Sequence, residues 1–427
     1  MEQIQTVVAG LGQALTFLVA YWWIYTPLLL FFAVMETYRA YTRTGYMQSL
    51  KWVLLEVTPP PDVPKSPKIA ENLFSALHAI YIGGTSWKKM FFEGKVPDWF
   101  SLEIVANQGI MRFYIRSPEG LRNLVEAQIF AQYPDAQVSV ADDYVNQLPR
   151  KLPNEEYDLF GTELIFTKED AYPIKTYPDF EEKGGEDEHR WTDPLAPLAE
   201  VMSTVGPGEH VWVQMVVRPT GGDWVKEGQK IVDELIGKKQ KAEPGFFEQA
   251  VTAIDSLIPG SVPSEPKKEE KESSMMNLTP GQRLVLEKVE MKMSKLGFKA
   301  GIRFLYVARK DAFNRARISG TIGMFKQLYS NNLNTFKPNG AVSTFSRGIL
   351  YWLFPSDRGF FAAMQEYERK YRIYQQYRIR AFVRKYVILN TEELATLWHL
   401  PGLNVKAPGF PRVEAKTGQP PAGLPTQ

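Results

Sequence analysis

The stretch NTEELATLWHLPG, near the end of the chain, combines residue types that could do chemistry, because two carboxylates precede a histidine. Metal sites and acid–base pairs are built from such groups. Glu392 and Glu393 are adjacent, however, and neighbouring side chains point in different directions on a helix. Asn390 or Thr391 can cap a helix here, with Glu393 at the capping-box spacing from Asn390. We therefore predict a capped helix in which His399 is a helix-end residue and not a ligand.

The other residue patterns of catalysis are missing from the sequence. It contains no cysteine, and its four histidines show neither HxxxH nor HxH spacing, which argues against cysteine nucleophiles and zinc sites. It also lacks the motifs GxxxxGK[ST], GxSxG, GxGxxG and HExxH, which mark phosphate loops, nucleophile elbows, dinucleotide sites and zinc peptidases. We expect no catalytic residue, no metal and no cofactor, and we predict that the protein is not an enzyme.

A segment rich in tyrosine and arginine, GFFAAMQEYERKYRIYQQYRIRAFVR, is the strongest candidate for binding chemistry. Cations interleaved with aromatic rings suit contacts with single-stranded nucleic acid or with a phosphate backbone. The alternative is that the tyrosines pack on a sheet while the arginines face water or the acidic part of the chain. The candidate contact residues for nucleic acid or a partner are Arg369, Lys370, Arg372, Arg378, Arg380, Arg384, Lys385, Tyr371, Tyr374 and Tyr377.

The charges divide unevenly along the chain, although the formal net charge is only +2. From Asn277 to the end there are 24 Lys and Arg residues against 9 Asp and Glu, whereas the residues before it hold 26 against 39. Two interpretations are open. Either the acidic and basic parts attract each other, or the basic part binds an anionic partner.

The N-terminal region has no charged residue from Val7 to Met35. A helix of about 20 apolar residues matches the ~30 Å hydrocarbon core of a bilayer. Cations just beyond it, at Arg39, Arg43 and Lys51, favour a cytoplasmic C-terminal side. We therefore expect one transmembrane helix at about residues 13–35 in the bacterial cytoplasmic membrane, with the N-terminus outside and the main body in the cytoplasm. The residues expected inside the membrane are Phe17, Leu18, Trp22, Trp23, Pro27, Leu28, Leu29, Leu30, Phe31 and Phe32.

The rest of the sequence alternates short strand and helix patterns. SLEIVANQGIMRFYIRS predicts two strands joined near Asn107, Gln108 and Gly109, and TPGQRLVLEKVEMKMSKLGF predicts a helix capped by Thr279 with Pro280 at its first position. We predict an α+β fold in which the transmembrane helix precedes two α/β-sandwich, ferredoxin-like lobes in the cytoplasm. The expected parts are a membrane anchor at 1–50, a first lobe at 51–237, a flexible charged linker at 238–277, a second, basic lobe at 278–402 and a proline-rich tail at 403–427.

Three segments of this sequence resemble a known family: SLEIVANQGIMRFYIRSPEGLRNLVEAQIFAQYP, GIRFLYVARKDAFNRARISGTIGMFKQLYSNNLNTF, and ILNTEELATLWHLPG followed by VKAPGFPRVEAKTGQPPAGLP. They are similar to the region that precedes the motor in membrane-anchored ATPases of conjugation and type IV secretion, the coupling-protein and HerA/TraG-like group. The resemblance covers roughly residues 50–420. In that group the Glu-Glu-Leu-Ala helix and the proline-rich stretch lead into the ATPase core, which this sequence does not contain.

The resemblance implies a membrane subunit that takes part in moving DNA or protein across the cell envelope. Either a separately encoded hexameric ATPase docks on the basic lobe and tail, or the chain is a fragment of a longer ATPase. The implied partners are the lipid bilayer, that ATPase, other secretion-system subunits and DNA, and a homo-oligomer is a further alternative. The alternative function is a membrane-tethered nucleic-acid-binding protein that acts without a motor.

Overall fold

A computed structural model describes residue 16 and residues 20–60, 66–81, 86–183, 189–236, 278–344, 360–402 and 411–413. The predicted linker at 238–277, most of the predicted tail, and Phe17 and Leu18 lie outside these residues. The chain divides into two compact units. Unit 1 comprises residues 1–52 and 82–98, and unit 2 comprises residues 53–81 and 99–427.

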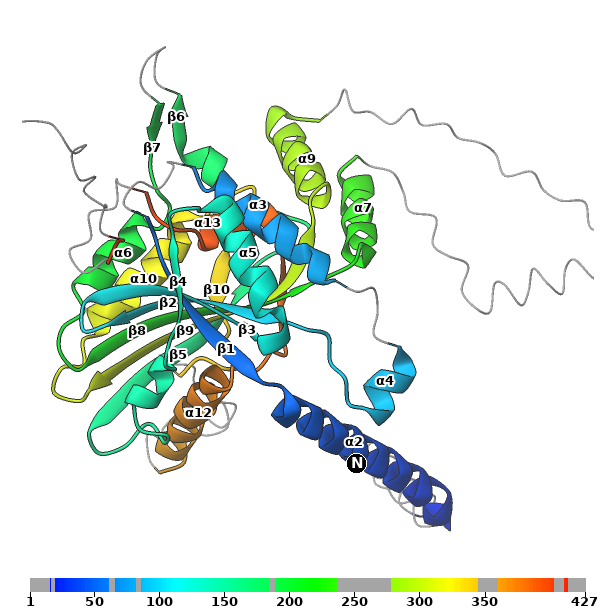
Figure 1. The fold of residues 1–427 in the computed structure, drawn as a ribbon. Helices are drawn as coiled ribbons and strands as arrows, with labels where there is room; N and C mark the ends of the chain where they lie inside the picture. The colour runs from blue at the N-terminus through cyan, green and yellow to red at the C-terminus, as the bar shows by residue number, and fades with distance from the viewer. Residues whose placement is uncertain are drawn as a thin grey trace, which may run out of the picture. The chain divides into compact units, whose positions relative to one another are not determined.

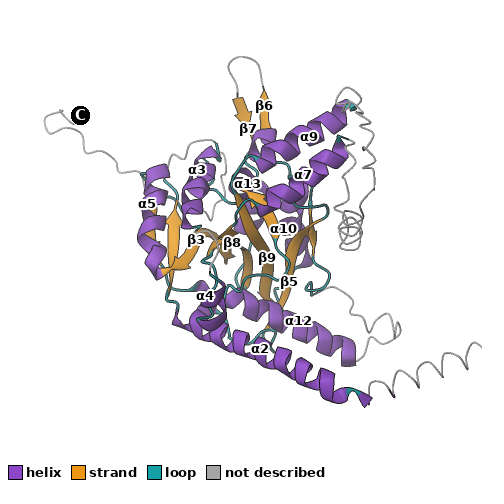
Figure 2. Ribbon diagram, turned by 90° about the vertical axis from the view of Figure 1, so that its right-hand side faces the viewer, coloured by secondary structure: helices purple, strands orange, loops and turns teal. Residues whose placement is uncertain are grey.

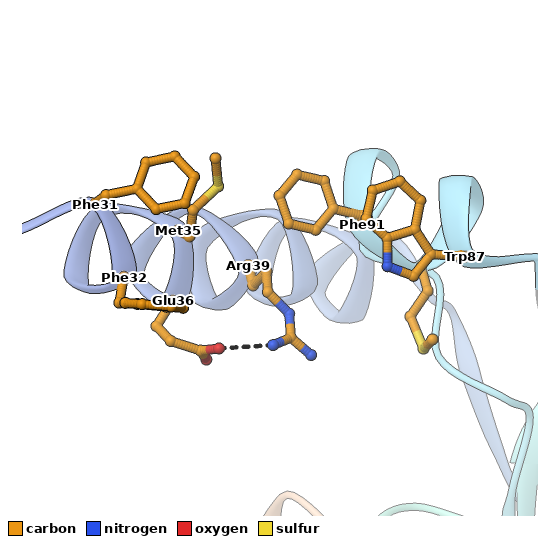
Figure 3. Close-up of a pocket in the computed structure, with 8 residues that line it drawn as sticks. Phe31, Phe32, Met35, Glu36, Arg39, Trp87 and Phe91 are labelled. Atoms are coloured by element: carbon orange, nitrogen blue, oxygen red, sulfur yellow. Dashed lines mark hydrogen bonds and ion pairs between the residues drawn. The ribbon is translucent and has the colours of Figure 1, made fainter. Parts of the chain in front are cut away.

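In its described part, unit 1 consists mainly of helix α2 (Trp22–Ser49) and the short helix α4 (Trp87–Phe92). The rings of Trp87 and Phe91 stack with their centroids 5.3 Å apart, and Phe91 lies 5.6 Å from the ring of Tyr38 on α2. These aromatic contacts join the two helices beside a hollow in the surface of unit 1 (Figure 3). The hollow is lined by Phe31, Phe32, Met35, Glu36, Arg39, Trp87, Met90 and Phe91.

The expectation of a transmembrane helix at about residues 13–35 is wrong. Within the described residues, no helix is both long enough and apolar enough to cross a membrane. The apolar part of α2, from Trp22 to Met35, has 14 residues, or about 21 Å of helix against a hydrocarbon core of about 30 Å. Its first turns include Trp, Tyr, Thr and Pro residues, and the helix then continues through Glu36 and Arg39. The described residues of the predicted span lie on α2 and are exposed: Trp22, Trp23, Pro27, Leu28, Leu29, Leu30, Phe31 and Phe32.

Unit 2 is organised around a nine-stranded sheet with the strand order β10-β5-β9-β8-β2-β3-β1-β4, in which β11 also pairs with β9. The central strand β8 is antiparallel to both of its neighbours, β2 and β9. The strands are β1 (Trp52–Thr58), β2 (Phe100–Asn107), β3 (Ile110–Pro118), β4 (Gln137–Val140), β5 (Tyr157–Phe166), β8 (Glu209–Pro219), β9 (Gly297–Arg309), β10 (Phe336–Pro338) and β11 (Val387–Asn390). A separate hairpin of β6 (Glu181–Lys183) and β7 (His189–Trp191) projects from the sheet (Figure 1).

Helices cover the two faces of this sheet unequally (Figures 1 and 2). A large apolar core lies under α3 (Lys68–Leu77), α5 (Arg122–Gln132), α6 (Ala196–Ser203), α10 (Arg315–Gln327) and α13 (Thr391–Leu397). Helix α12 (Phe360–Arg378) lies on the opposite face, over a smaller cluster. Helices α7 (Asp223–Leu235) and α9 (Pro280–Met293) pack against each other through Val232, Val285 and Val289.

Local sequence signals account for several boundaries of these elements. The predicted hairpin is confirmed, because β2 and β3 pair from Asn107 and Ile110 outward and the turn residues Gln108 and Gly109 both have positive φ angles. The predicted cap of α9 is also confirmed, since the Thr279 hydroxyl accepts a hydrogen bond from an amide of the first turn.

The continuous sheet corrects the prediction of two separate lobes. Strand β8 belongs to the expected first lobe and β9 to the expected second lobe, yet they pair along the whole of Glu209–Pro219. The structure is α+β with one large antiparallel sheet. Both expected lobes contribute strands to it, and α12 covers strands from both.

Candidate functional site

The predicted Tyr/Arg helix is present as α12, and the candidate residues on and after it divide into buried and exposed sets. The structure buries Lys370, Tyr374, Tyr377 and Arg380, leaves Arg369, Tyr371 and Arg378 half-buried, and exposes Arg372, Arg384 and Lys385. Two of the three candidate tyrosines therefore pack in the core, where their rings offer no platform for a nucleic-acid base.

Several cations of α12 are paired with carboxylates. The Lys370 ammonium lies 2.8 Å from Asp158 on β5 and 2.7 Å from Glu366 one turn earlier. Arg372 lies 3.2 Å from Glu368, also one turn earlier, and its side chain is 74% exposed. The ion pair of Lys370 with Asp158 joins the helix to the sheet. The pair of Arg372 with Glu368 is exposed to solvent and contributes little to stability.

Arg380 is the most completely bonded residue of the site, although it was predicted as a surface contact. Its Nε and Nη2 atoms donate to the two oxygens of Glu103 at 2.9 and 3.1 Å. Its Nη1 and Nη2 atoms donate to Asp143 at 2.7 and 2.8 Å, and Nη1 also donates to the carbonyl of Arg378 at 2.8 Å. All five N–H groups of the guanidinium thus have acceptors in a fully buried position, which is the arrangement that a buried arginine requires.

The backbone conformation of Arg380 is also unusual. Its φ angle is +50°, a left-handed conformation that costs a residue with a Cβ about 1–2 kcal/mol. The amides of Arg380 and Ala381 donate to the carbonyls of Tyr377 and Gln376, a helix-ending pattern in which glycine is usual. The side-chain bonds of Arg380 compensate for this backbone cost.

The partners of Arg380 belong to a polar row that crosses the sheet. Glu103 on β2 lies opposite Gln214 on β8, Gln214 lies opposite Arg303 on β9, and Arg303 lies opposite Glu163 on β5. The Gln214 amide donates to Glu103 at 3.2 Å, and Arg303 Nε donates to Glu163 at 3.1 Å. Residues opposite each other on antiparallel strands share one face, so this polar row lies on the face that α12 covers.

Hydroxyl groups complete the bonding of Glu103. Ser101 and Tyr144 each donate to its carboxylate at 2.7 Å, and the hydroxyl of Tyr144 is also 2.7 Å from that of Tyr377 on α12. Burial by itself raises the pKa of Glu103, but the Arg380 guanidinium and these donors outweigh it, so the pKa lies below its usual range. The carboxylate is therefore ionised inside the protein.

Burial has other electrostatic consequences on this face. It raises the pKa of Tyr144 and Tyr377 well above that of free tyrosine, so both hydroxyls stay protonated. Burial, reinforced by the charge of Arg380, lowers the pKa of Arg116 on β3 to about 10. Arg116 nevertheless remains a cation at neutral pH.

Two glycines on strands allow α12 and the segment after it to approach the sheet closely. A Cβ at Gly161 on β5 would come within 2.9 Å of the side chain of Ile373, and one at Gly301 on β9 within 2.4 Å of Val383. Both distances are too short for real side chains, so each glycine is required by the contact above it.

The stretch that first suggested chemistry has a structural role. Asn390 and Glu393 form the predicted capping box of α13, and Leu394, Leu397 and Trp398 are buried. The Glu393 carboxylate lies 3.0 Å from the buried Lys292 ammonium of α9. The capping-box prediction is confirmed, and Glu393 additionally joins α13 to α9.

His399 also has structural partners, and the described residues contain no group of three or more His, Asp or Glu side chains that could hold a metal ion. Its Nδ1 atom is 2.8 Å from the carbonyl of Ala395, and its Nε2 atom is 3.0 Å from the buried Asp193 carboxylate. The histidine thus joins the end of α13 to the loop before α6.

Residue pattern alone did not reveal the polar row. Its signal was a charged or amide residue in the middle of each of four largely apolar strand patterns, for example Glu103 in SLEIVAN and Arg303 in GIRFLYVAR. Such residues can be recognised as a group only when the strand order is known. Because Glu103 and Arg380 are fully buried, the row offers no surface to a ligand, and its function is to position α12.

A family model described as a domain of unknown function, DUF8128, matches residues 42–410. The chain belongs to this family. The DUF8128 match begins within α2 and extends past α13, so it includes the sheet, the polar row and α12. No curated protein matches the chain.

Proposed function

We propose that the protein is a subunit of a conjugation or type IV secretion machine, associated with the bacterial cytoplasmic membrane, that docks a separately encoded hexameric ATPase. In this role it helps to present DNA or protein to the motor and catalyses no reaction itself. The sequence resemblance described above supports the docking of an ATPase. The exposed surface of unit 1 supports the association with the membrane.

The observation that supports the proposal most is the exposed apolar surface of unit 1. Leu28, Leu29, Leu30 and Phe32 on α2 are each more than half exposed, as is Trp87 on α4. Exposed apolar surface of this extent marks an interaction site. Cations accompany it on both helices, including Arg39, Lys88 and Lys89, and aromatic and basic side chains together suit an anionic lipid surface.

The membrane contact can be tested by placing charges on α2. The double substitution Leu29→Glu and Phe32→Glu should move the full chain from the membrane fraction to the supernatant on cell fractionation. The reason is that it costs free energy to place a carboxylate among lipid chains. Tyr41→Glu is a matched control, since Tyr41 is exposed on the same helix beyond the apolar stretch. If the double variant stays with the membrane, α2 is not the contact.

The docking role can be tested by purifying the full chain from native membranes after mild cross-linking. We expect a hexameric ATPase to co-purify in defined stoichiometry, and mass spectrometry should identify it. Recovery of the chain without any ATPase, under conditions that retain other membrane partners, would contradict the docking role.

A second candidate function, nucleic-acid binding without a motor, is favoured by one observation. Arg384 and Lys385 follow α12, are exposed, and form no ion pair with any described residue. A phosphate backbone would neutralise such cations, and its affinity would fall steeply with salt. A salt titration of binding to the full chain tests this function, and affinity that does not change with salt would contradict it.

A further inference from the structure

The end of the sheet beneath the segment after α12 has an unusual concentration of cations. Arg218 on β8 and Lys299 on β9 lie directly opposite each other. Opposite residues of an antiparallel pair share one face, and like charges placed there repel. A pair of apposed cations is therefore a local electrostatic cost that some other group must offset.

Aromatic rings from the segment after α12 offset part of this cost. The Arg218 guanidinium lies 4.5 Å from the centre of the Phe382 ring, and the Lys299 ammonium lies 4.9 Å from that of Tyr386. The face of an aromatic ring attracts a cation. The two rings are neighbours, with their centroids 6.3 Å apart.

Val383 fixes the segment in this place. Its side chain sits on Gly301, where even a single added carbon would clash. On either side of this contact, Phe382 is half-buried and Tyr386 is exposed. Arg384 and Lys385, between Val383 and Tyr386, both face solvent. The contact of Val383 with β9 thus places the neighbouring rings and cations at the surface.

Three cations of this surface, Lys299, Arg384 and Lys385, have few carboxylates near them among the described residues. Burial raises the pKa of the Asp170 carboxylate, which interacts electrostatically with Lys385, whose charge acts to lower that pKa. One oxygen of Asp170 accepts the amide of Ile388 at 3.2 Å. Lys299, Arg384 and Lys385 form no ion pair with a described residue. The surface therefore keeps an excess of positive charge next to accessible aromatic rings.

We propose that this surface, formed by Arg218, Lys299 and the segment Phe382–Tyr386, binds single-stranded nucleic acid. The proposal rests on the second candidate function and gives it a location. Phosphates would contact the cations, and one or two bases would pack on the exposed parts of Phe382 and Tyr386. A double helix presents no free base faces, so it would gain only the phosphate contacts.

The test uses the full chain and a fluorescently labelled oligothymidylate of about 20 nucleotides, which is longer than the usual binding site. Replacing Lys299, Arg384 and Lys385 with alanine should reduce the slope of log affinity against log salt by about 2, since each single-strand phosphate contact contributes about 0.7. Tyr386→Ala should weaken binding about 5-fold or more and leave the salt slope unchanged, because a base contact carries no counterion.

A matched control removes three cations elsewhere. Lys226→Ala, Lys230→Ala and Lys310→Ala change the net charge equally at exposed positions on α7 and just after β9. This variant should bind as the unchanged protein does. If it loses as much affinity as the surface variant, the binding is general charge attraction and the proposal is wrong.

Two other outcomes would also overturn the proposal. One is the absence of oligonucleotide binding by the unchanged protein at low salt. The other is binding of phosphatidylserine vesicles, but not of the oligonucleotide, that depends on Lys299, Arg384 and Lys385, because the surface would then recognise lipid headgroups. None of these measurements requires the ATPase, so they leave the docking role to its own test.

Discussion

The two faces of the sheet in unit 2 bury side chains of opposite character. On one face, α3, α5, α6, α10 and α13 cover residues such as Phe304, Ile302 and Val213, and the contacts are apolar. On the other face, α12 covers a row in which Glu103 and Arg303 are charged. Residues on both faces are buried, but the covering helices contact the two faces through different kinds of side chain.

The two faces contribute differently to the stability of unit 2 and to the placement of its helices. Apolar burial stabilises a fold in proportion to the area removed from water and requires little precision of placement. The attraction within a buried ion pair must first offset the desolvation of both charges, so the pair contributes little net stability. Removing only one of the two partners is costly, because the other charge is then left buried and unpaired. The apolar face therefore supplies most of the stability of unit 2, and the polar row determines where α12 ends.

Phe304→Ala should produce the largest effect, on the apolar face. Phe304 is fully buried and its ring lies 5.8 Å from that of Phe160, so truncation leaves a cavity. We expect a loss of about 3–5 kcal/mol in the free energy of unfolding, measured by denaturant titration. A loss below about 1 kcal/mol would show that this face does not dominate stability.

Arg380→Met should cost about 3 kcal/mol, on the polar face. The change leaves Glu103 as a buried, unpaired carboxylate and removes two bonds from Asp143. Denaturant titration gives the loss, and Lys370→Met provides a comparison at a less buried ion pair. A stability equal to that of the unchanged protein would contradict the bonding described here.

Adding Glu103→Gln to Arg380→Met should recover about 1–3 kcal/mol, because the buried charge is removed and the amide can still bond to Tyr144. Recovery of this kind is expected only for a pair of charged partners. On the apolar face, a second truncation should add to the loss of unfolding free energy caused by the first. If the double variant is less stable than Arg380→Met alone, the row stabilises α12 through more than charge pairing.

The polar face should also make stability depend on pH through His210, which lies on β8 two residues before Trp212. Burial lowers the pKa of His210 to about 4, whereas an unfolded chain protonates histidine below about 6.5. The unfolded state therefore binds more protons between these values, so stability falls as the pH drops, by at most about 1.4 kcal/mol per pH unit. His210→Gln should flatten this part of the curve of unfolding free energy against pH, and an unchanged slope would contradict the assignment.

Arg372→Ala should have the smallest effect, no more than about 0.5 kcal/mol, because its pair with Glu368 is exposed on the outer side of α12. Thermal unfolding is sensitive enough to set this limit. A larger loss would mean that the outer side of α12 is packed against another part of the protein.

Local features were predictable from the sequence because the residues that cause them are close together. The hairpin turn at Gln108 and Gly109, and the caps at Thr279 and Asn390, each depend on a few consecutive residues. Strand pairing depends on residues far apart in the chain, so the sequence pattern does not indicate the pairing of β8 with β9 and predicts two lobes instead.

The site was harder to predict for the same reason. The pattern of α12 identified its tyrosines and arginines, but helical spacing gives no information on which side faces a sheet. Burial of Tyr377 and Arg380 follows from Glu103 and Gln214, which lie on strands far away in sequence. The uncharged stretch at the N-terminus predicts a membrane span, but the apolar part of α2 among the described residues runs only from Trp22 to Met35, which is shorter than a span.

The polar row also has a consequence during synthesis of the chain. Glu103 emerges from the ribosome 277 residues before Arg380, so β2 is made long before α12 can cover it. A sheet face left uncovered for that time would promote aggregation if it were wholly apolar. Glu103, Gln214 and Arg303 put polar groups at the centre of this face, and these groups would favour contact with water over aggregation until α12 covers them.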